Sequence, residues 1–177
     1  MANKQALREL QSRLAERLQA ARTQRRGQSW LAVESGGRGF LFPLREAGEI
    51  FALSPILTVP HSQRWFLGVA NLRGHLHGVV DLAGFLGLSA PPGMAGHGLR
   101  EQSRLVGFNQ SLDLNCVLAV DRLSGLRGED ELSPESALEG AQPGFVGARF
   151  RDAAGRLWQE LNLSALAGDE TFLRIVG

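Results

Sequence analysis

The hydrophobic residues of this chain follow two different periods. Within residues 1–27, leucine and alanine recur every three or four positions, which is the spacing of one face of an α-helix. Asn3 can cap the start of this helix and Gly27 can end it. From residue 28 onwards, short apolar runs separated by glycine and proline predict a mainly β structure. The apolar stripe of the predicted helix consists of Leu7, Leu10, Leu14, Leu18 and Ala21.

A glycine-rich turn at Gly36-Gly-Arg-Gly39 separates two apolar runs, residues 30–34 and 40–44. Extended runs on both sides of such a turn predict a β-hairpin. A phosphate-binding loop does not fit, because the glycines lack a Lys-Ser/Thr ending and no helix-forming segment follows them. Residues 49–53 predict the next strand.

Residues 74–85 resemble residues 155–166, which lie 81 positions further along the chain. In both segments a glycine turn leads into a strand, and Asp81 or Asn162 then stands where the N-cap of a short helix belongs. Shared residue types at several aligned positions favour a duplication. We therefore expect two related β-subdomains.

The second unit follows a segment rich in glycine and proline, residues 89–98, which predicts a connector. Residues 104–108 and 114–120 then predict a strand pair. Ser133-Pro-Glu-Ser136 predicts the start of a helix, with a serine cap and proline at the first helical position.

Positive charge is concentrated in the N-terminal helix. Residues 1–26 contain seven Lys or Arg against two Glu, a formal charge of +5, which leaves −4 on the rest of a chain with net charge +1. Three interpretations stay open: the helix docks on its own domain or is solvated, it binds a partner helix, or it binds an anionic surface. Nucleic acid and membrane are less favoured, because the helix has no aromatic residue to stack on bases or to insert at an interface.

The remaining composition indicates a soluble globular protein. Its 177 residues are enough to bury a core, and 44% of them are hydrophobic. We find no signal peptide or membrane-spanning segment, so we expect a cytoplasmic location without direct membrane insertion. The single cysteine, Cys116, cannot form an internal disulfide, and its apolar neighbours predict a buried thiol.

Candidate catalytic and metal-binding residues are few. His75 and His77 share one face of a predicted strand with Asp81, but no second group of His or Cys completes a zinc site. A Gly-x-Ser-x-Gly nucleophile elbow is also missing. We therefore expect no metal, no cofactor and no enzymatic activity. The opposite face of the same strand follows the core pattern with Leu76, Gly78, Val80 and Leu82.

One segment carries a family signature. Phe66–Leu88 contains Gly68-Val-Ala-Asn-Leu-Arg-Gly74, followed by Val79-Val-Asp-Leu82. With these motifs, residues 28–170 resemble the CheW-like coupling domain of bacterial chemosensory systems. The basic N-terminal helix and the small size most resemble the coupling protein of a twitching-motility system, which implies control of type IV pili. Further segments that fit the family are Glu49-Ile50, residues 117–123, Phe145-Val-Gly147 and Leu161-Asn-Leu163.

The resemblance implies both a fold and a role. The fold consists of two intertwined five-stranded β-barrels that resemble SH3 domains, with short helices. The role is that of a non-catalytic adaptor, or scaffold, with two protein partners. One surface binds the regulatory domain of a CheA-like histidine kinase, and another binds the cytoplasmic tip of a methyl-accepting chemoreceptor. We therefore expect the protein in polar or membrane-attached receptor arrays, held there through its partners.

The matching motif positions imply which residues bind these partners. Arg73 is the expected receptor-facing residue, with Asn71 and Gly74 shaping its edge, and Glu49 is expected on the kinase-facing side. Each has a structural alternative: Arg73 could tie down a carbonyl, Asn71 could satisfy a turn, and Glu49 could be a solvated strand residue.

The sequence departs from the family pattern at several positions. His75 and His77-Gly78 stand where aliphatic residues and a proline are more usual, and Asn162 replaces an aspartate. Asparagine also caps helices, so the expected fold is unaffected. Asp81 and Asp121 belong to the motifs, but we assign them to cap and turn roles.

The expected organisation is a helix at residues 1–27 and a CheW-like domain at residues 28–177. Within that domain we expect a first barrel at about 28–88, a connector at 89–99 and a second barrel at about 100–177, with exchange of strands or helices allowed. An alternative function of a different class is a nucleic-acid-binding adaptor that uses the basic helix on a small β-barrel. A coupling protein, in contrast, is expected to bind no nucleic acid.

Overall fold

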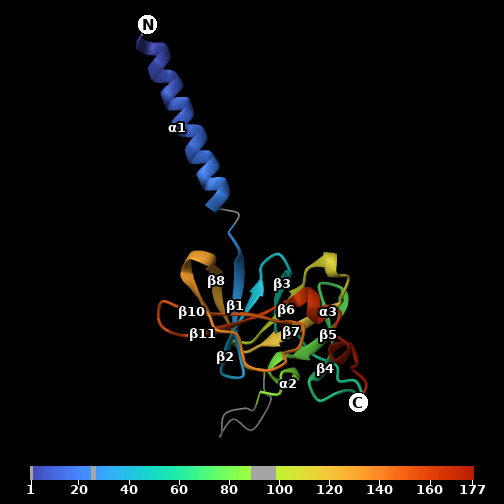
Figure 1. Ribbon diagram of the computed structural model, residues 1–177. Coiled ribbons are helices and arrows are strands. Elements are labelled where there is room, and N and C mark those ends of the chain that lie inside the picture. The colour runs from blue at the N-terminus through green and yellow to red at the C-terminus, as the bar shows by residue number, and fades with distance from the viewer. Residues whose placement is uncertain (1, 25–26, 89–98) are drawn as a thin grey trace.

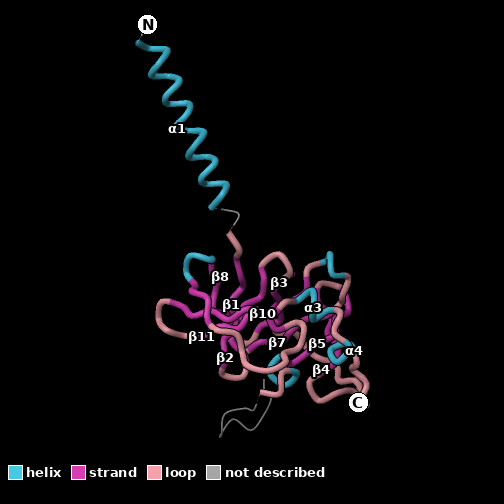
Figure 2. Tube along the Cα trace, in the orientation of Figure 1, coloured by secondary structure: helices cyan, strands magenta, loops and turns pink. Residues whose placement is uncertain are grey.

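The computed structural model describes residues 2–24, 27–88 and 99–177, with the side chains of residues 2–4, 6–7 and 20–24 left out of the description. The chain starts with one long helix, α1 (Ala2–Gln24), which stands clear of a β-rich domain (Figure 1). Strands dominate that domain, and its helices are short (Figure 2). The mainly β class with an N-terminal helix is therefore confirmed. The expected connector at residues 89–98 lies outside the described residues.

The first sheet has six strands, which come from both ends of the β-rich domain. These strands are β1 (Ser29–Ser35), β2 (Arg38–Pro43), β8 (Arg122–Gly128), β9 (Leu132–Glu135), β10 (Val146–Asp152) and β11 (Leu157–Leu161). Their order is β8-β1-β2-β11-β10-β9. Neighbours are antiparallel except β2 and β11, which run parallel. The first hairpin of the domain is thus paired with the last one.

The second sheet has five strands from the middle of the chain. These are β3 (Ala47–Ala52), β4 (Phe66–Leu72), β5 (His75–Asp81), β6 (Arg104–Phe108) and β7 (Cys116–Val120), in the order β3-β6-β7-β5-β4. Only β5 and β7 pair in parallel in this sheet. Short helices complete the fold: α2 (Leu82–Phe85), α3 (Leu163–Ala167), α4 (Glu170–Leu173) and the 3₁₀ turns Gln110–Leu112 and Glu129–Glu131.

The two sheets share one arrangement. In each, an antiparallel hairpin, β4–β5 or β10–β11, ends in a short helix whose N-cap position is Asp81 or Asn162. The second strand of that hairpin then pairs in parallel with a strand of another hairpin, β7 or β2. Asn162 accepts a 2.9 Å hydrogen bond from the N–H of Ala165, whereas Asp81 makes no such cap bond. This shared arrangement agrees with the expected pair of related β-subdomains.

The details of the predicted barrels need correction. The sheets have six and five strands rather than five each, and within the described residues neither strand order closes on itself. Each sheet combines strands from residues 28–88 with strands from residues 100–177. The reason is that sheets form by pairing in space, and sequence order does not determine which hairpins become neighbours.

The predicted helix at Ser133–Ser136 is wrong. Residues 133–135 belong to strand β9, which pairs with β10 at the edge of the first sheet. Pro134 is tolerated there because an edge strand can leave one N–H position unused. Local capping signals were therefore overridden by strand pairing.

Strands β1, β2, β6 and β7 are buried on both faces, which explains why they read as continuous apolar runs. One face of each sheet contributes to a shared core that joins the two sheets, with Leu31 and Phe42 from the first and Val106 and Leu118 from the second. Two smaller clusters cover the opposite faces. They contain Trp30, Ala32, Leu41, Leu132 and Trp158 on the first sheet, and Ala70, Leu72, Val79, Leu105, Val117 and Ala119 on the second.

Candidate partner-binding site

The expected receptor-facing residues lie together at the β4–β5 turn. The pairing of Leu72 with His75 leaves Arg73 and Gly74 as the two turn residues. Both have positive φ angles, 52° and 82°, as a two-residue hairpin turn of type I′ requires. The side-chain oxygen of Asn71 accepts a 2.9 Å hydrogen bond from the N–H of Gly74. The turn therefore presents Arg73 at the tip of a well-defined hairpin.

Arg73 is an unusual choice for its backbone position. The left-handed region costs a non-glycine residue about 1–2 kcal/mol, and the matching turn of the β1–β2 hairpin uses Gly36 and Gly37 instead. The Arg73 side chain is 73% exposed, so burial in the domain does not compensate for this cost. An outlier of this kind points to a role for the side chain beyond the turn.

Glu49 lies against this turn and not on a separate surface. Its carboxylate forms an ion pair with the guanidinium of Arg73. The guanidinium also lies 5.9 Å from the ring centroid of Phe51, within the range of a cation–π contact. Although β3 and β4 form opposite edges of the second sheet, the sheet curls enough for β3 to reach the β4–β5 turn. All four predicted binding residues therefore occupy one surface, which we call the Arg73 surface: Glu49, Asn71, Arg73 and Gly74.

Two neighbours of the Arg73 surface were not predicted as parts of it. Leu76, the cross-strand partner of Asn71, is 63% exposed, although alternation along the strand predicts it in the core. The reason is that β5 extends beyond the core at this end, while its other end buries Val79 and Val80 on both faces. The second unpredicted neighbour of the Arg73 surface is Phe51. Its ring also contacts the ring of His77, and the two ring centroids are 5.8 Å apart. An apolar residue two positions after a two-residue turn, where the strand is still close to its end, is a signal that could have identified Leu76.

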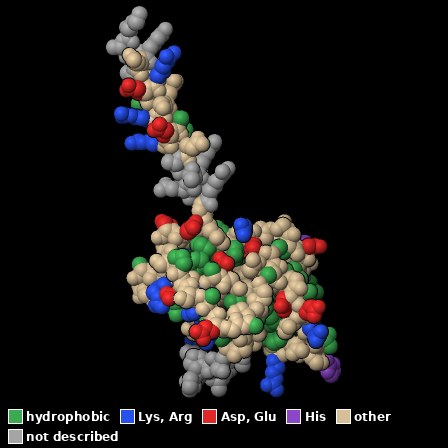
Figure 3. All heavy atoms as spheres, in the orientation of Figure 1, with side chains coloured by type: hydrophobic (Ala, Val, Ile, Leu, Met, Phe, Trp, Pro, Cys, Tyr) green, Lys and Arg blue, Asp and Glu red, His purple; other side chains and the backbone are tan. Residues whose placement is uncertain are grey.

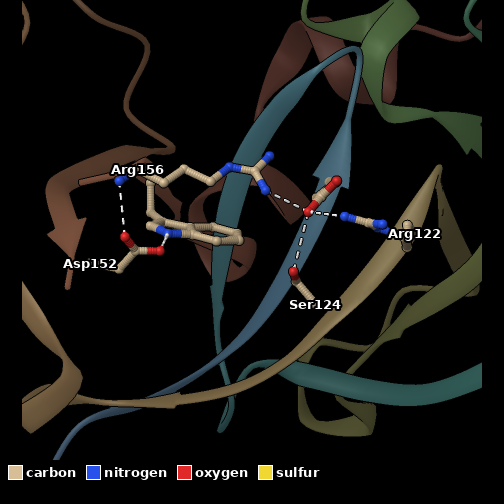
Figure 4. A network of polar contacts seen from close by, with 6 residues as sticks. Arg122, Ser124, Asp152 and Arg156 are labelled. Atoms are coloured by element: carbon tan, nitrogen blue, oxygen red, sulfur yellow. Dashed lines mark hydrogen bonds and ion pairs between the residues drawn. The ribbon is translucent and has the colours of Figure 1, made fainter. Parts of the chain in front are cut away.

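A network of polar contacts ties the first sheet together elsewhere. The Glu34 carboxylate accepts hydrogen bonds from Arg122 at 2.7 Å, Arg156 at 2.5 Å and the Ser124 hydroxyl at 3.2 Å. Figure 4 shows Arg122, Ser124 and Arg156 converging on this carboxylate. Arg156 also covers the ring of Trp158 at 4.8 Å. These contacts join β1, β8 and the start of β11, so we assign the network to structure.

The ionisation of Glu34 reflects this environment. Partial burial by itself raises the pKa of the Glu34 carboxyl, but the hydrogen bonds and charges of Arg122 and Arg156 outweigh it and lower that pKa. The Glu34 carboxylate therefore stays ionised at neutral pH.

Asp121 has a turn role near this network, because its carboxylate accepts a 2.9 Å hydrogen bond from the N–H of Gly36.

The described residues offer little reactive chemistry. The Cys116 thiol is buried, which raises its pKa to about 12 and keeps it protonated. In the described part of the chain, no three His, Cys, Asp or Glu residues form a cluster suitable for a metal ion, and His75 and His77 therefore belong to no such cluster. Among the described helices, none combines the length and the hydrophobicity needed to cross a membrane.

Comparison with known proteins gives consistent matches. A family described as the CheW-like domain matches residues 29–171. The chain is 33% identical over 157 residues to protein PilI of Pseudomonas aeruginosa, covering 84% of this chain and 81% of PilI. It is 31% identical over 99 residues to chemotaxis protein CheW of Rhizobium meliloti, covering 54% of this chain and 64% of that protein.

A solved structure shows the same fold. The scaffolding protein TtCheW from Thermoanaerobacter tengcongensis superposes with a TM-score of 0.59, covering 76% of this chain and 88% of that one. The two sequences are 15% identical, so this likeness concerns the fold. The matched family begins at residue 29 and therefore leaves α1 outside.

Proposed function

Because this chain belongs to the CheW-like domain family, we propose that it is a non-catalytic coupling protein of a bacterial chemosensory pathway. It holds a methyl-accepting chemoreceptor and a CheA-like histidine kinase in one assembly. A protein without its own reaction changes kinase output by binding its partners differently in their signalling states. The observation that carries this proposal is the family match across nearly the whole β-rich domain.

The similarity to PilI supports a more specific setting. We place the protein in a chemosensory pathway that controls twitching motility through type IV pili. In this setting it is cytoplasmic and joins receptor arrays through its two partners.

We assign the partner contacts to the Arg73 surface. Arg73, with Asn71 and Gly74 shaping its turn, contacts the receptor tip, and Glu49 lies toward the regulatory domain of the kinase. The exposed guanidinium carries a permanent charge and several donors in a fixed plane, which suits recognition of a polar partner group. A receptor group that binds Arg73 must share or displace Glu49, so the two partner contacts are energetically linked.

The decisive experiment replaces Arg73 by aspartate in the full chain. Equilibrium binding is measured separately to a soluble receptor fragment that contains the cytoplasmic tip and to the kinase regulatory domain. We expect receptor affinity to fall by about tenfold or more, because a central interface arginine typically contributes over 1 kcal/mol. The free energy of unfolding should fall by no more than about 1 kcal/mol, because the ion pair with Glu49 that is lost is exposed. Wild-type receptor affinity in a folded Arg73→Asp protein would remove Arg73 from the interface.

Arg38→Asp is the matched control. Arg38 is also an exposed arginine that follows a two-residue hairpin turn, but it lies in the first sheet. The substitution makes the same change of charge, so both binding constants should stay at their wild-type values. If the wild-type chain binds neither partner, the proposed coupling function is wrong, independently of the role of Arg73.

A further inference from the structure

Helix α1 exposes an apolar ridge that the CheW-like domain does not use. Leu10, Leu14 and Leu18 are 58%, 53% and 62% exposed. Every residue from Arg8 to Gln19 is exposed, and Figure 3 shows hydrophobic and charged side chains on a helix that stands clear of the domain. Three exposed leucines at every fourth position are costly in water unless a partner covers them.

The spacing of the ridge indicates what kind of partner covers it. Leu10, Leu14 and Leu18 each lie about one turn apart, so they line one strip along the helix. A ridge along i, i+4 and i+8 fits the groove of a second helix. The geometry therefore points to a helical partner.

The charges beside the ridge indicate the chemistry of that partner. Arg13 and Arg17, one turn apart, flank one side of the leucines at about 60–100° from Leu14, while Glu9 and Glu16 fall on the far face of the helix. Side chains that flank an apolar seam meet the flanking side chains of the partner helix. The basic flank therefore favours acidic residues opposite it.

A second copy of α1 fits this arrangement poorly. Residues 1–26 have a formal charge of +5, so two copies would bring like charges together along the whole seam. In an antiparallel pair centred on Leu14, the flank with Arg13 and Arg17 would meet the same flank of the other copy. An anionic membrane is also disfavoured, because the ridge lacks Trp and Phe.

We propose that α1 is a second interaction surface, which binds an acidic amphipathic helix of a partner protein through Leu10, Leu14, Leu18, Arg13 and Arg17. This contact is separate from the Arg73 surface and does not depend on the coupling function. It adds an attachment point to the scaffold outside the family domain.

The test uses a synthetic peptide with the sequence of residues 2–24 in which Lys4, Arg8, Arg13, Arg17 and Arg22 are replaced by glutamate. This peptide keeps the leucine stripe and inverts the flanking charge. We expect the full chain to bind it with a Kd on the order of micromolar, and more weakly as salt is raised. Absence of binding at about 100 μM peptide would overturn the proposal.

Variants of the full chain separate the leucine and arginine contributions. The triple variant Leu10→Ser, Leu14→Ser, Leu18→Ser should lose at least about tenfold in affinity. Arg13→Gln with Arg17→Gln should weaken binding and reduce its salt dependence. The matched control, Ser12→Glu with Gln19→Glu, makes the same change in net charge on the far side of the helix, and its affinity should stay within about twofold of wild type.

Competing occupants are tested in the same assay. Tighter binding to the unmodified peptide of residues 2–24 would show self-association and overturn the acidic partner. Tighter binding to phosphatidylglycerol vesicles or to duplex DNA would do so as well. An equal loss of affinity in the matched control and in the Arg13 and Arg17 variant would show that net charge alone drives binding, against the proposed seam.

Discussion

The carboxylate of Glu46 accepts a 2.8 Å hydrogen bond from the backbone N–H of Leu163, although 117 residues separate the two in sequence. Glu46 lies between β2 and β3, where the chain passes from the first sheet to the second, and it is only 8% exposed. It also accepts a 2.8 Å hydrogen bond from the hydroxyl of Ser164. A buried carboxylate thus satisfies donors at the start of α3 that the short helix leaves unpaired.

Removal of this acceptor should destabilise the whole domain. We expect Glu46→Ala to lower the free energy of unfolding by about 2–3 kcal/mol, because buried donors lose a charged partner. Urea unfolding at neutral pH measures the loss. Glu46→Gln keeps an acceptor oxygen and should lose only about 1 kcal/mol, and the exposed control Glu139→Ala about 0.5 kcal/mol or less. Equal losses for the alanine and glutamine variants would contradict the acceptor role.

The ion pair between Arg73 and Glu49 should contribute little to stability. Both side chains are exposed, at 73% and 43%, and ion pairs in such positions usually contribute about 0.2–1 kcal/mol. A double-mutant cycle with Arg73→Ala and Glu49→Ala, followed by urea unfolding, gives this coupling energy. The same cycle followed by receptor binding should give a larger value. A coupling above about 2 kcal/mol in unfolding would mean that the pair holds the sheet together instead.

Acid should remove the contribution of Glu34. The pKa of Glu34 is lowered in the folded state, so its ionised form stabilises the fold at neutral pH, and this contribution disappears as the pH falls below about 4.5 and through the lowered pKa. We expect Glu34→Gln to cost about 1–3 kcal/mol at pH 7, and the difference from wild type to shrink toward about pH 3. Unfolding curves from about pH 7 to pH 3 test this, and a difference that stays constant would contradict it.

Burial should make Cys116 inert in the folded protein. Its thiol has a pKa of about 12, and only the thiolate reacts with alkylating agents. We expect iodoacetamide at pH 8 to modify Cys116 about 100-fold or more slowly in the folded protein than in urea. Mass spectrometry measures both rates. Comparable rates would show that the β7 region opens readily.

The strands that were easiest to predict are those with the least ambiguous local pattern. β1 and β2 flank a turn of two glycines with φ angles of 59° and 75°, and this turn alone fixes their register. β6 and β7 are apolar runs bounded by polar residues, and burial on both faces produced that pattern. Asn162 was predicted as a cap because capping depends on only a few adjacent residues.

The features that could not be predicted depend on contacts between distant segments. No local signal places Glu49 beside Arg73, because the ion pair requires the second sheet to curl. Leu76 follows the alternation of a core residue, but its exposure depends on where the core ends. Pro134 resembles the first residue of a helix until β10 lies beside it. In each case tertiary pairing overrode a local preference.

The parallel pairing of β2 with β11 determines when each sheet can be completed during synthesis. Residues 38–43 leave the ribosome more than a hundred residues before residues 157–161, a delay of roughly ten seconds at bacterial rates. All strands of the second sheet lie within residues 47–120, so they are synthesised before β11. This sheet can therefore form while the β1–β2 hairpin still lacks its neighbour β11. Until the last hairpin emerges, the apolar faces of β1 and β2 are open to other chains, so the newly made protein is most prone to aggregation at its oldest strands.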